Sequence, residues 1–139
     1  MDIEAGDIFK IDVGDGKPAH YWIVLNTPRN GSEILLVSWS DRLNVPAVTD
    51  VWALGLQICR DLPLAKPSAL FVARARLESI QWISEKGAEY KGRAPKDVLR
   101  RARCNMFWFG RLLRPQIKRV VEWYSVDWKP ECSPAPPTS

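Results

Sequence analysis

The chain has 139 residues, 46% of them hydrophobic, and a formal net charge of +4. This size fits one domain with a real core, and no apolar run approaches the roughly 20 residues that a membrane span requires. The N-terminus has neither a basic nor an apolar region, so no signal peptide is expected there. The mild positive charge is by itself weak support for a nucleic-acid partner.

Cysteine and histidine usage argues against a structural metal site. The three cysteines are far apart and include no Cys-x-x-Cys pair, and the chain has one histidine. One histidine does not complete the usual His/Cys zinc patterns. We therefore expect no metal and no cofactor, and we interpret Cys59, Cys104 and Cys132 as reduced thiols of a cytoplasmic protein.

Three apolar runs at the start of the chain predict an antiparallel sheet. They span residues 8–13, 20–25 and 34–39. In the first run Phe9, Ile11 and Val13 fall on one face. The sequences between the runs contain Gly, Pro and an Asn-Gly pair, which are typical of tight turns. We interpret the runs as the antiparallel core of a small β-barrel.

The rest of the chain predicts more strands and then helices. Further strands are expected at 51–55, 68–76 and 77–83, with a polar loop at 84–93. Helices are expected at about 95–109 and 116–124, because the apolar period changes after Pro95. The Pro/Ser-rich residues 127–139 are expected to be disordered. The sequence therefore predicts a mostly-β α+β domain at 1–126, with a barrel at about 5–83 followed by a C-terminal helical pair.

His20 is the first candidate for chemistry, since no complete catalytic motif is present. Its unperturbed pKa lies near neutrality, and it opens a strand beside a flexible loop that also carries Lys17. Such a position suits a general acid or base. The alternative is a half-exposed histidine at a strand end with no role.

Arg74 and Arg76 are the second candidate. The alternation in residues 68–76 predicts that both arginines lie on one face of a strand. Two guanidinium groups there could hold a phosphate through paired hydrogen bonds. The alternatives are a solvated face or an ion pair with Glu78 or Asp41.

Two polar groups complete the candidates. Ser38, Ser40 and Asp41 end the third run and could hydrogen-bond a phosphate or a base, although simple strand termination is the plainer reading. The second group is basic: residues 93–119 contain nine Lys and Arg residues against the single carboxylate of Asp97. That surface could bind phosphates in a salt-dependent way or face an acidic protein, or it could be solvated. Its candidate residues are Arg100, Arg101, Arg103 and Arg111.

These features together resemble the PemK/MazF family of toxin–antitoxin ribonucleases. The resemblance is carried by Gly-Asp-Ile-Phe near the N-terminus, the apolar strand opening at His20, the Ser-Trp-Ser-Asp strand end and the later Arg74. It covers residues 5–83, with the helical tail matching more loosely. It implies an SH3-like barrel, a possible homodimer, a cognate antitoxin protein as partner and metal-independent cleavage of single-stranded RNA.

The resemblance also implies roles for individual residues. His20 would act as acid or base, Arg74 would stabilise charge on the phosphate, and Ser40 matches a hydroxyl residue of the family. Lys17, Asp41, Arg76, Arg100 and Arg103 would bind substrate. The chain departs from the family in two places: the Arg-Pro pair usual before the second strand is missing, and Arg76 stands where some members have an acid. A non-catalytic SH3-like module that binds nucleic acid or a protein is therefore the alternative.

Overall fold

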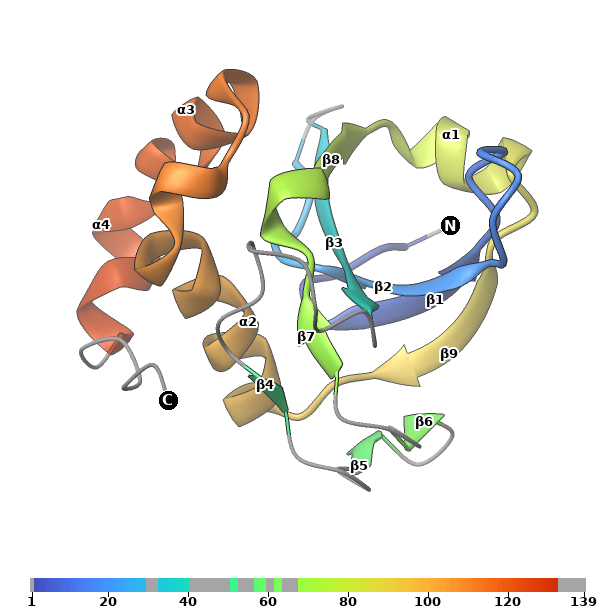
Figure 1. The fold of residues 1–139 in the computed structure, drawn as a ribbon, viewed down its shortest axis with the longest axis horizontal. Coiled ribbons are helices and arrows are strands. Elements are labelled where there is room, and N and C mark those ends of the chain that lie inside the picture. Colours follow the sequence, from blue (N-terminus) through green and yellow to red (C-terminus); the bar gives the residue numbers. More distant parts are fainter. Residues whose placement is uncertain are drawn as a thin grey trace.

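The fold is described from a computed structural model, which places residues 2–29, 33–40, 51–52, 57–59, 62–63 and 68–132. Only the backbone is described for residues 51–52, 57–59 and 62–63. An antiparallel sheet and a set of helices make an α+β fold (Figure 1), which confirms the predicted class. Among the described residues, the helices and 3-10 turns together hold more residues than the strands, so only the α+β part of the predicted mostly-β class is confirmed.

One sheet contains most of the strands. The strands are β1 Asp7–Ile11, β2 His20–Val24, β3 Ile34–Ser40, β4 Val51–Trp52, β5 Gln57–Cys59, β6 Leu62–Pro63, β7 Ser68–Leu70, β8 Arg76–Glu78 and β9 Glu89–Arg93. The sheet runs in the order β4-β7-β3-β2-β1-β9, with β8 also paired to β3, and its pairings are antiparallel. β5 and β6 form a separate pair.

β3 lies at the centre of this arrangement. One of its edges pairs with β2, and its other edge is divided between β8, opposite residues 34–36, and β7, opposite residues 39–40. All seven of its residues are buried. Because side chains alternate along a strand, β3 contributes to the core on both faces of the sheet.

Two hydrophobic clusters cover these two faces. The helix-side cluster joins strand residues such as Ile23 and Val37 to the C-terminal helices. The α1-side cluster lies on the other face, where strand residues such as Trp22 and Leu36 pack against Ile83 of α1. The helices are α1 Ile80–Glu85, α2 Lys96–Trp108, α3 Pro115–Trp123 and α4 Ser125–Trp128, with short 3-10 turns η1 Val72–Arg74, η2 Gly110–Leu112 and η3 Lys129–Glu131. In Figure 1, α2, α3 and α4 lie together beside the sheet, with α1 at the opposite side.

A polar junction ties the C-terminal helices to the end of β2. The buried Asn26 amide donates from Nδ2 to the Glu33 carbonyl at 3.0 Å and to the Tyr124 hydroxyl at 3.1 Å. The Tyr124 ring stacks on Trp128 with centroids 4.4 Å apart. These contacts hold the helices to the hairpin between β2 and β3, since a buried amide left without partners would cost roughly 1–3 kcal/mol.

A disulfide joins α2 to the residue that follows η3. Cys104 in α2 is bonded to Cys132 directly after η3, with Cα atoms 5.4 Å apart. The interpretation of these two cysteines as reduced thiols is therefore wrong. Residues 127–131 belong to α4 and η3, and Trp128 is only 4% exposed, so the predicted disordered tail begins too early. Residues 133–139 lie outside the described part of the chain.

Three other element predictions differ from the structure. The predicted strand at 68–76 is divided into β7, η1 and β8, and only part of the strand predicted at 77–83 remains, because α1 begins at Ile80. Ser79 accepts a hydrogen bond from the Trp82 amide at 3.0 Å and so caps this helix. The expected polar loop at 84–93 contains β9 as an edge strand on β1.

Candidate functional site

His20 opens β2, opposite Ile11 of β1, and is half-buried. The strands place it on the α1-side face, since its cross-strand partner Ile11 belongs to the α1-side cluster. The loop before it carries Lys17 and Asp15, where the Lys17 amide donates to the Asp15 carboxylate at 3.0 Å. That bond lowers the pKa of Asp15, and the charges of Lys17 and protonated His20 lower it further.

Ser38 and Ser40 come to the same region from β3. Ser38 pairs with Trp22 of β2 in the last pair of the β2–β3 register, and an extension of that register by two residues would set Ser40 opposite His20. Side chains two residues apart lie on one face of a strand, so Ser38, Ser40 and His20 share the α1-side face. Ser38 and Ser40 are 7% and 8% exposed, which leaves little of either open to solvent. The indole N–H of the neighbouring Trp22 is also buried, and it has no hydrogen-bond partner among the described residues.

Arg76 shares this face but is engaged within the protein. It pairs with Leu36 of β3, and its Nε and Nη2 atoms donate to Glu78 Oε1 at 3.1 and 3.0 Å. Its guanidinium also lies over the Trp82 ring, 5.0 Å from the centroid. Of the readings left open by the sequence, the ion pair with Glu78 is the one in the structure.

Arg74 does not lie on a strand with Arg76. It ends η1, and its exposed guanidinium lies over the Phe71 ring at 5.4 Å. The prediction that both arginines share one strand face is therefore wrong, because the chain turns through η1 between β7 and β8. The Phe71 amide donates to the Ser38 carbonyl at 2.8 Å, so η1 begins beside Ser38, on the edge of β3 away from His20. Asp41 lies outside the described residues.

Two of the predicted basic residues of α2, Arg100 and Arg103, differ in environment. Arg100 is exposed, whereas Arg103 is half-buried and donates from Nε to the Leu25 carbonyl at 2.9 Å. The Arg103 guanidinium also lies 4.6 Å from the centroid of the Trp128 ring. Burial lowers the pKa of Arg103 from its ordinary value. Arg103 therefore holds α2 to β2, and Arg100 alone of the two presents its charge to solvent.

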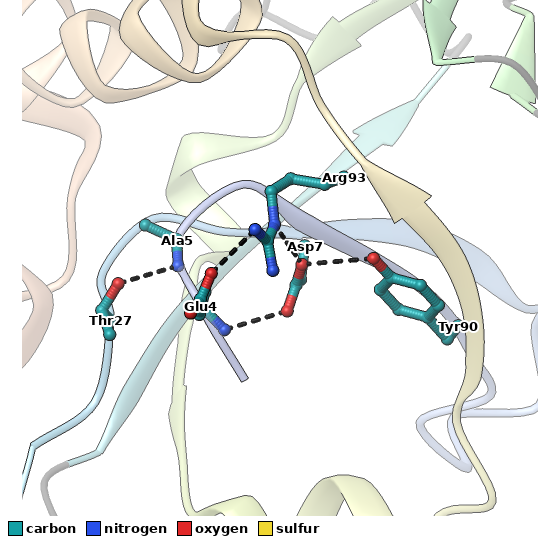
Figure 2. Close-up of polar contacts among 6 residues, drawn as sticks. All are labelled: Glu4, Ala5, Asp7, Thr27, Tyr90 and Arg93. Atoms are coloured by element: carbon teal, nitrogen blue, oxygen red, sulfur yellow. Dashed lines mark hydrogen bonds and ion pairs between the residues drawn. The ribbon is translucent and has the colours of Figure 1, made fainter. Parts of the chain in front are cut away.

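A polar cluster at the start of β1 was missed by sequence reasoning. Figure 2 shows the buried Asp7 carboxylate accepting from the Glu4 amide at 2.9 Å, from Arg93 Nε at 3.0 Å and, at 3.5 Å, from the Tyr90 hydroxyl. Arg93 also forms an ion pair with Glu4 at 2.8 Å. The hydrogen bond that Arg93 donates to Asp7, followed by the negative charge of Asp7, raises the pKa of Arg93.

This cluster has a structural explanation. Arg93 ends β9 and Asp7 begins β1, so their contact fixes the two strand ends together. Gly6 has φ +95°, and a Cβ there would lie 3.3 Å from the Arg93 side chain, which favours glycine at that position. The sequence signal was the Gly-Asp-Ile-Phe segment, but nothing in it pointed to a partner 86 residues away.

Neither a metal-binding cluster nor a membrane-spanning helix occurs among the described residues. Within the described ranges, no group of three or more His, Cys, Asp or Glu side chains is placed to hold a metal ion. None of the helices that the structure describes is long and apolar enough to cross a membrane.

Comparisons of the chain with protein-family models, with curated proteins and with solved structures give no match. A function must therefore be inferred from the residues of the site.

Proposed function

We propose that the chain is a metal-independent endoribonuclease of the toxin–antitoxin kind that cleaves single-stranded RNA. The observation that supports the proposal is the β2–β3 register, in which Trp22 pairs with Ser38, because its extension by two residues would set Ser40 opposite His20 on the same face. His20 is half-buried at the first position of β2, where part of its side chain remains accessible to a nucleotide. A histidine beside a hydroxyl suits proton transfer at neutral pH.

The reaction is attack by a ribose 2′-oxygen on the adjacent phosphorus. His20 takes the 2′-hydroxyl proton as the O–P bond forms, and the bond to the 5′-oxygen breaks. The departing 5′-oxygen takes a proton from water, so the products are a 2′,3′-cyclic phosphate and a 5′-hydroxyl. Ser40 donates a hydrogen bond to a phosphate oxygen, and a nearby cation stabilises the developing charge. Lys17, in the loop directly before His20, is the nearest proposed cation, since Arg76 is paired with Glu78. Arg74, to which the resemblance assigns this role, would have to reach the phosphate from the other edge of β3.

The remaining parts of the proposal follow from the same resemblance. They are closure of the sheet into an SH3-like barrel and inhibition by a cognate antitoxin. One edge of β3 pairs first with β8 and then with β7. Such a change of partner along one strand is compatible with the strongly curved sheet of a small barrel, and it supports barrel closure. Action on RNA would take place in the cytosol, where disulfides such as Cys104–Cys132 are rare. The cytosolic location is proposed only because the proposed substrate is RNA. The disulfide between Cys104 and Cys132 removes the earlier argument from reduced thiols.

The test is cleavage of a mixed-sequence single-stranded RNA by purified protein, with and without EDTA. We expect EDTA-resistant cleavage that leaves a 2′,3′-cyclic phosphate. His20→Ala is expected to lower the rate by roughly 10²–10⁴-fold, and Arg74→Ala to lower it as well. The exposed Glu85→Gln in α1 serves as the control that keeps full activity. Absence of cleavage by the wild-type protein, or full activity in both the His20 and Arg74 variants, would contradict the proposal.

A second candidate function is nucleic-acid binding without catalysis through the helical part of the chain. It is favoured by exposed cations that form no ion pair with any described residue: Lys96, Arg100, Arg111 and Arg119. Binding by these side chains should weaken with salt, by roughly 0.7 per phosphate contact on a log–log plot for single strands. Replacing all four with glutamine should abolish binding, whereas His20→Ala should not change it. Unchanged affinity in the fourfold variant would exclude this candidate.

A further inference from the structure

The disulfide closes a short segment over the C-terminal helices. The segment comprises α4, η3 and Cys132, and we call residues 125–132 the latch segment. α4 has four residues and η3 three, and helices this short are not stable by themselves in water. The latch segment is therefore held in place by its contacts with α2 and α3.

Only one side chain of the latch segment is buried. Trp128 is 4% exposed, Ser125 and Cys132 are half-buried, and the other side chains of the segment are exposed. Ordering each residue costs conformational entropy, and the burial of one tryptophan has to offset this cost for the whole segment. The covalent bond from Cys132 to α2 therefore decides whether the segment stays closed.

Trp128 covers two groups that have other attachments of their own. Its ring stacks on Tyr124 with centroids 4.4 Å apart, and the Arg103 guanidinium lies 4.6 Å from its centroid. The Tyr124 hydroxyl accepts from the Asn26 amide, and Arg103 donates to the Leu25 carbonyl. Because these two hydrogen bonds do not involve the latch segment, Tyr124 and Arg103 stay in place when Trp128 leaves, and both become accessible.

The two sulfur atoms of the bond differ in their access to solvent. Cys104 is 0% exposed, whereas Cys132 is half-buried, so a thiolate from solution reaches Cys132 Sγ first. Its attack forms a mixed disulfide with Cys132, and Cys104 leaves as a thiolate that takes a proton from water. A second small thiol attacks the outer sulfur of the mixed disulfide and releases Cys132, which is protonated in turn. Two small thiols thereby supply the two electrons and become one oxidised disulfide.

We propose that the latch segment is a redox-controlled cover of Arg103 and Tyr124. The disulfide keeps the cover closed in an oxidising environment, and a small thiol such as glutathione opens it in a reducing one. The open form presents Arg103 beside the exposed Arg100, its neighbour on the surface of α2, together with an aromatic ring. The sheet and α2 stay folded in both forms. The latch requires neither of the proposed functions, and its test contains no RNA.

Hydrogen exchange of the full chain, with and without reduced glutathione, tests the latch. After reduction we expect amide exchange in residues 125–132 to accelerate by about tenfold or more, while exchange in β3 stays slow. Cys132→Ser should show the fast exchange without any reductant. Cys59→Ser, which keeps the bond between Cys104 and Cys132, is the matched control and should respond like the wild type.

Labelling with phenylglyoxal, which modifies accessible arginines, measures the uncovering itself. Arg103 should be modified several-fold faster after reduction, whereas Arg100, which is exposed in both forms, should react at an unchanged rate. The proposal fails if thiol alkylation shows an open bond and the exchange in the latch segment or the labelling of Arg103 is unchanged. It also fails if exchange in β3 rises by the same factor, since the whole domain then unfolds. A bond that millimolar glutathione leaves closed would make the disulfide a permanent structural link and would likewise overturn the proposal.

Discussion

Opening the disulfide is expected to remove a large share of the protein's stability. The bond joins Cys104 to Cys132, 28 residues apart in sequence. In the chain-entropy treatment, a cross-link that closes a loop of this length stabilises the folded state by about 3.5 kcal/mol. Domains of this kind have total stabilities of only about 5–15 kcal/mol, so the loss would be easily measured.

The thermal consequence follows from the size of the chain. With 139 residues and an unfolding entropy of about 2.1 cal/mol/K per residue, this loss lowers Tm by roughly 12 °C. The assay is thermal unfolding followed by circular dichroism, with and without a phosphine reductant. Cys132→Ser should reproduce the effect and then show no further response to reductant. Cys59→Ser, which leaves the bond intact, should respond like the wild type.

Thiol counting provides an independent check of the same bond. Under denaturing conditions without reductant, alkylation should label one of the three cysteines, and all three after reduction. The reasoning would be refuted if all three were labelled before reduction. It would also be refuted if reductant shifted Tm by less than about 2 °C in a protein whose bond was shown to be closed.

Three further substitutions test the contacts that hold the fold, each measured by urea unfolding. Arg103→Ala removes the hydrogen bond to the Leu25 carbonyl, directly after β2, and the contact with the Trp128 ring, and should cost about 2–3 kcal/mol. Arg100→Ala, exposed on the same helix, should stay within about 0.5 kcal/mol; equal losses would refute the assigned role. Asp7→Asn should cost about 2–3 kcal/mol because the buried carboxylate accepts from three donors, against less than about 1 kcal/mol for Glu4→Gln in an exposed pair. Tyr124→Phe should cost about 1 kcal/mol, because the Asn26 amide loses the Tyr124 hydroxyl as an acceptor. An unchanged free energy of unfolding would show that this hydrogen bond does not stabilise the fold.

The sequence predicted the regular elements well where the local pattern was strong. The continuous apolar run at 20–25 and the alternation around Phe9 correspond to β2 and β1, and the helical period after Pro95 corresponds to α2. These signals depend on the side chains of one segment alone. The edge strand β9 was missed because its sequence, Glu-Tyr-Lys-Gly-Arg, is polar, and its position depends on pairing with β1.

The candidate site was harder to predict than the fold. The residues that share the α1-side face, His20 and Ser40, were identified because both stand at strand ends. Arg74 and Arg76 were misplaced because the 3-10 turn between them leaves no mark in an Ala-Arg alternation. Arg103 was grouped with the exposed cations, although its aliphatic length lets it reach the Leu25 carbonyl from a half-buried position. The first error concerns a local turn of the backbone, and the second concerns a tertiary partner.

The position of β3 has a consequence for how far the chain can be shortened. Its residues supply both hydrophobic clusters, and α2, α3 and α4 form the far wall of one of them. A product that ended before α2 would leave one face of the sheet, with Ile8, Ile23 and Val37, open to water. Such a fragment should aggregate instead of folding as an autonomous unit. The C-terminal helices are therefore a part of the smallest foldable length of this protein, and fusion partners or cleavage sites belong outside residues 2–132.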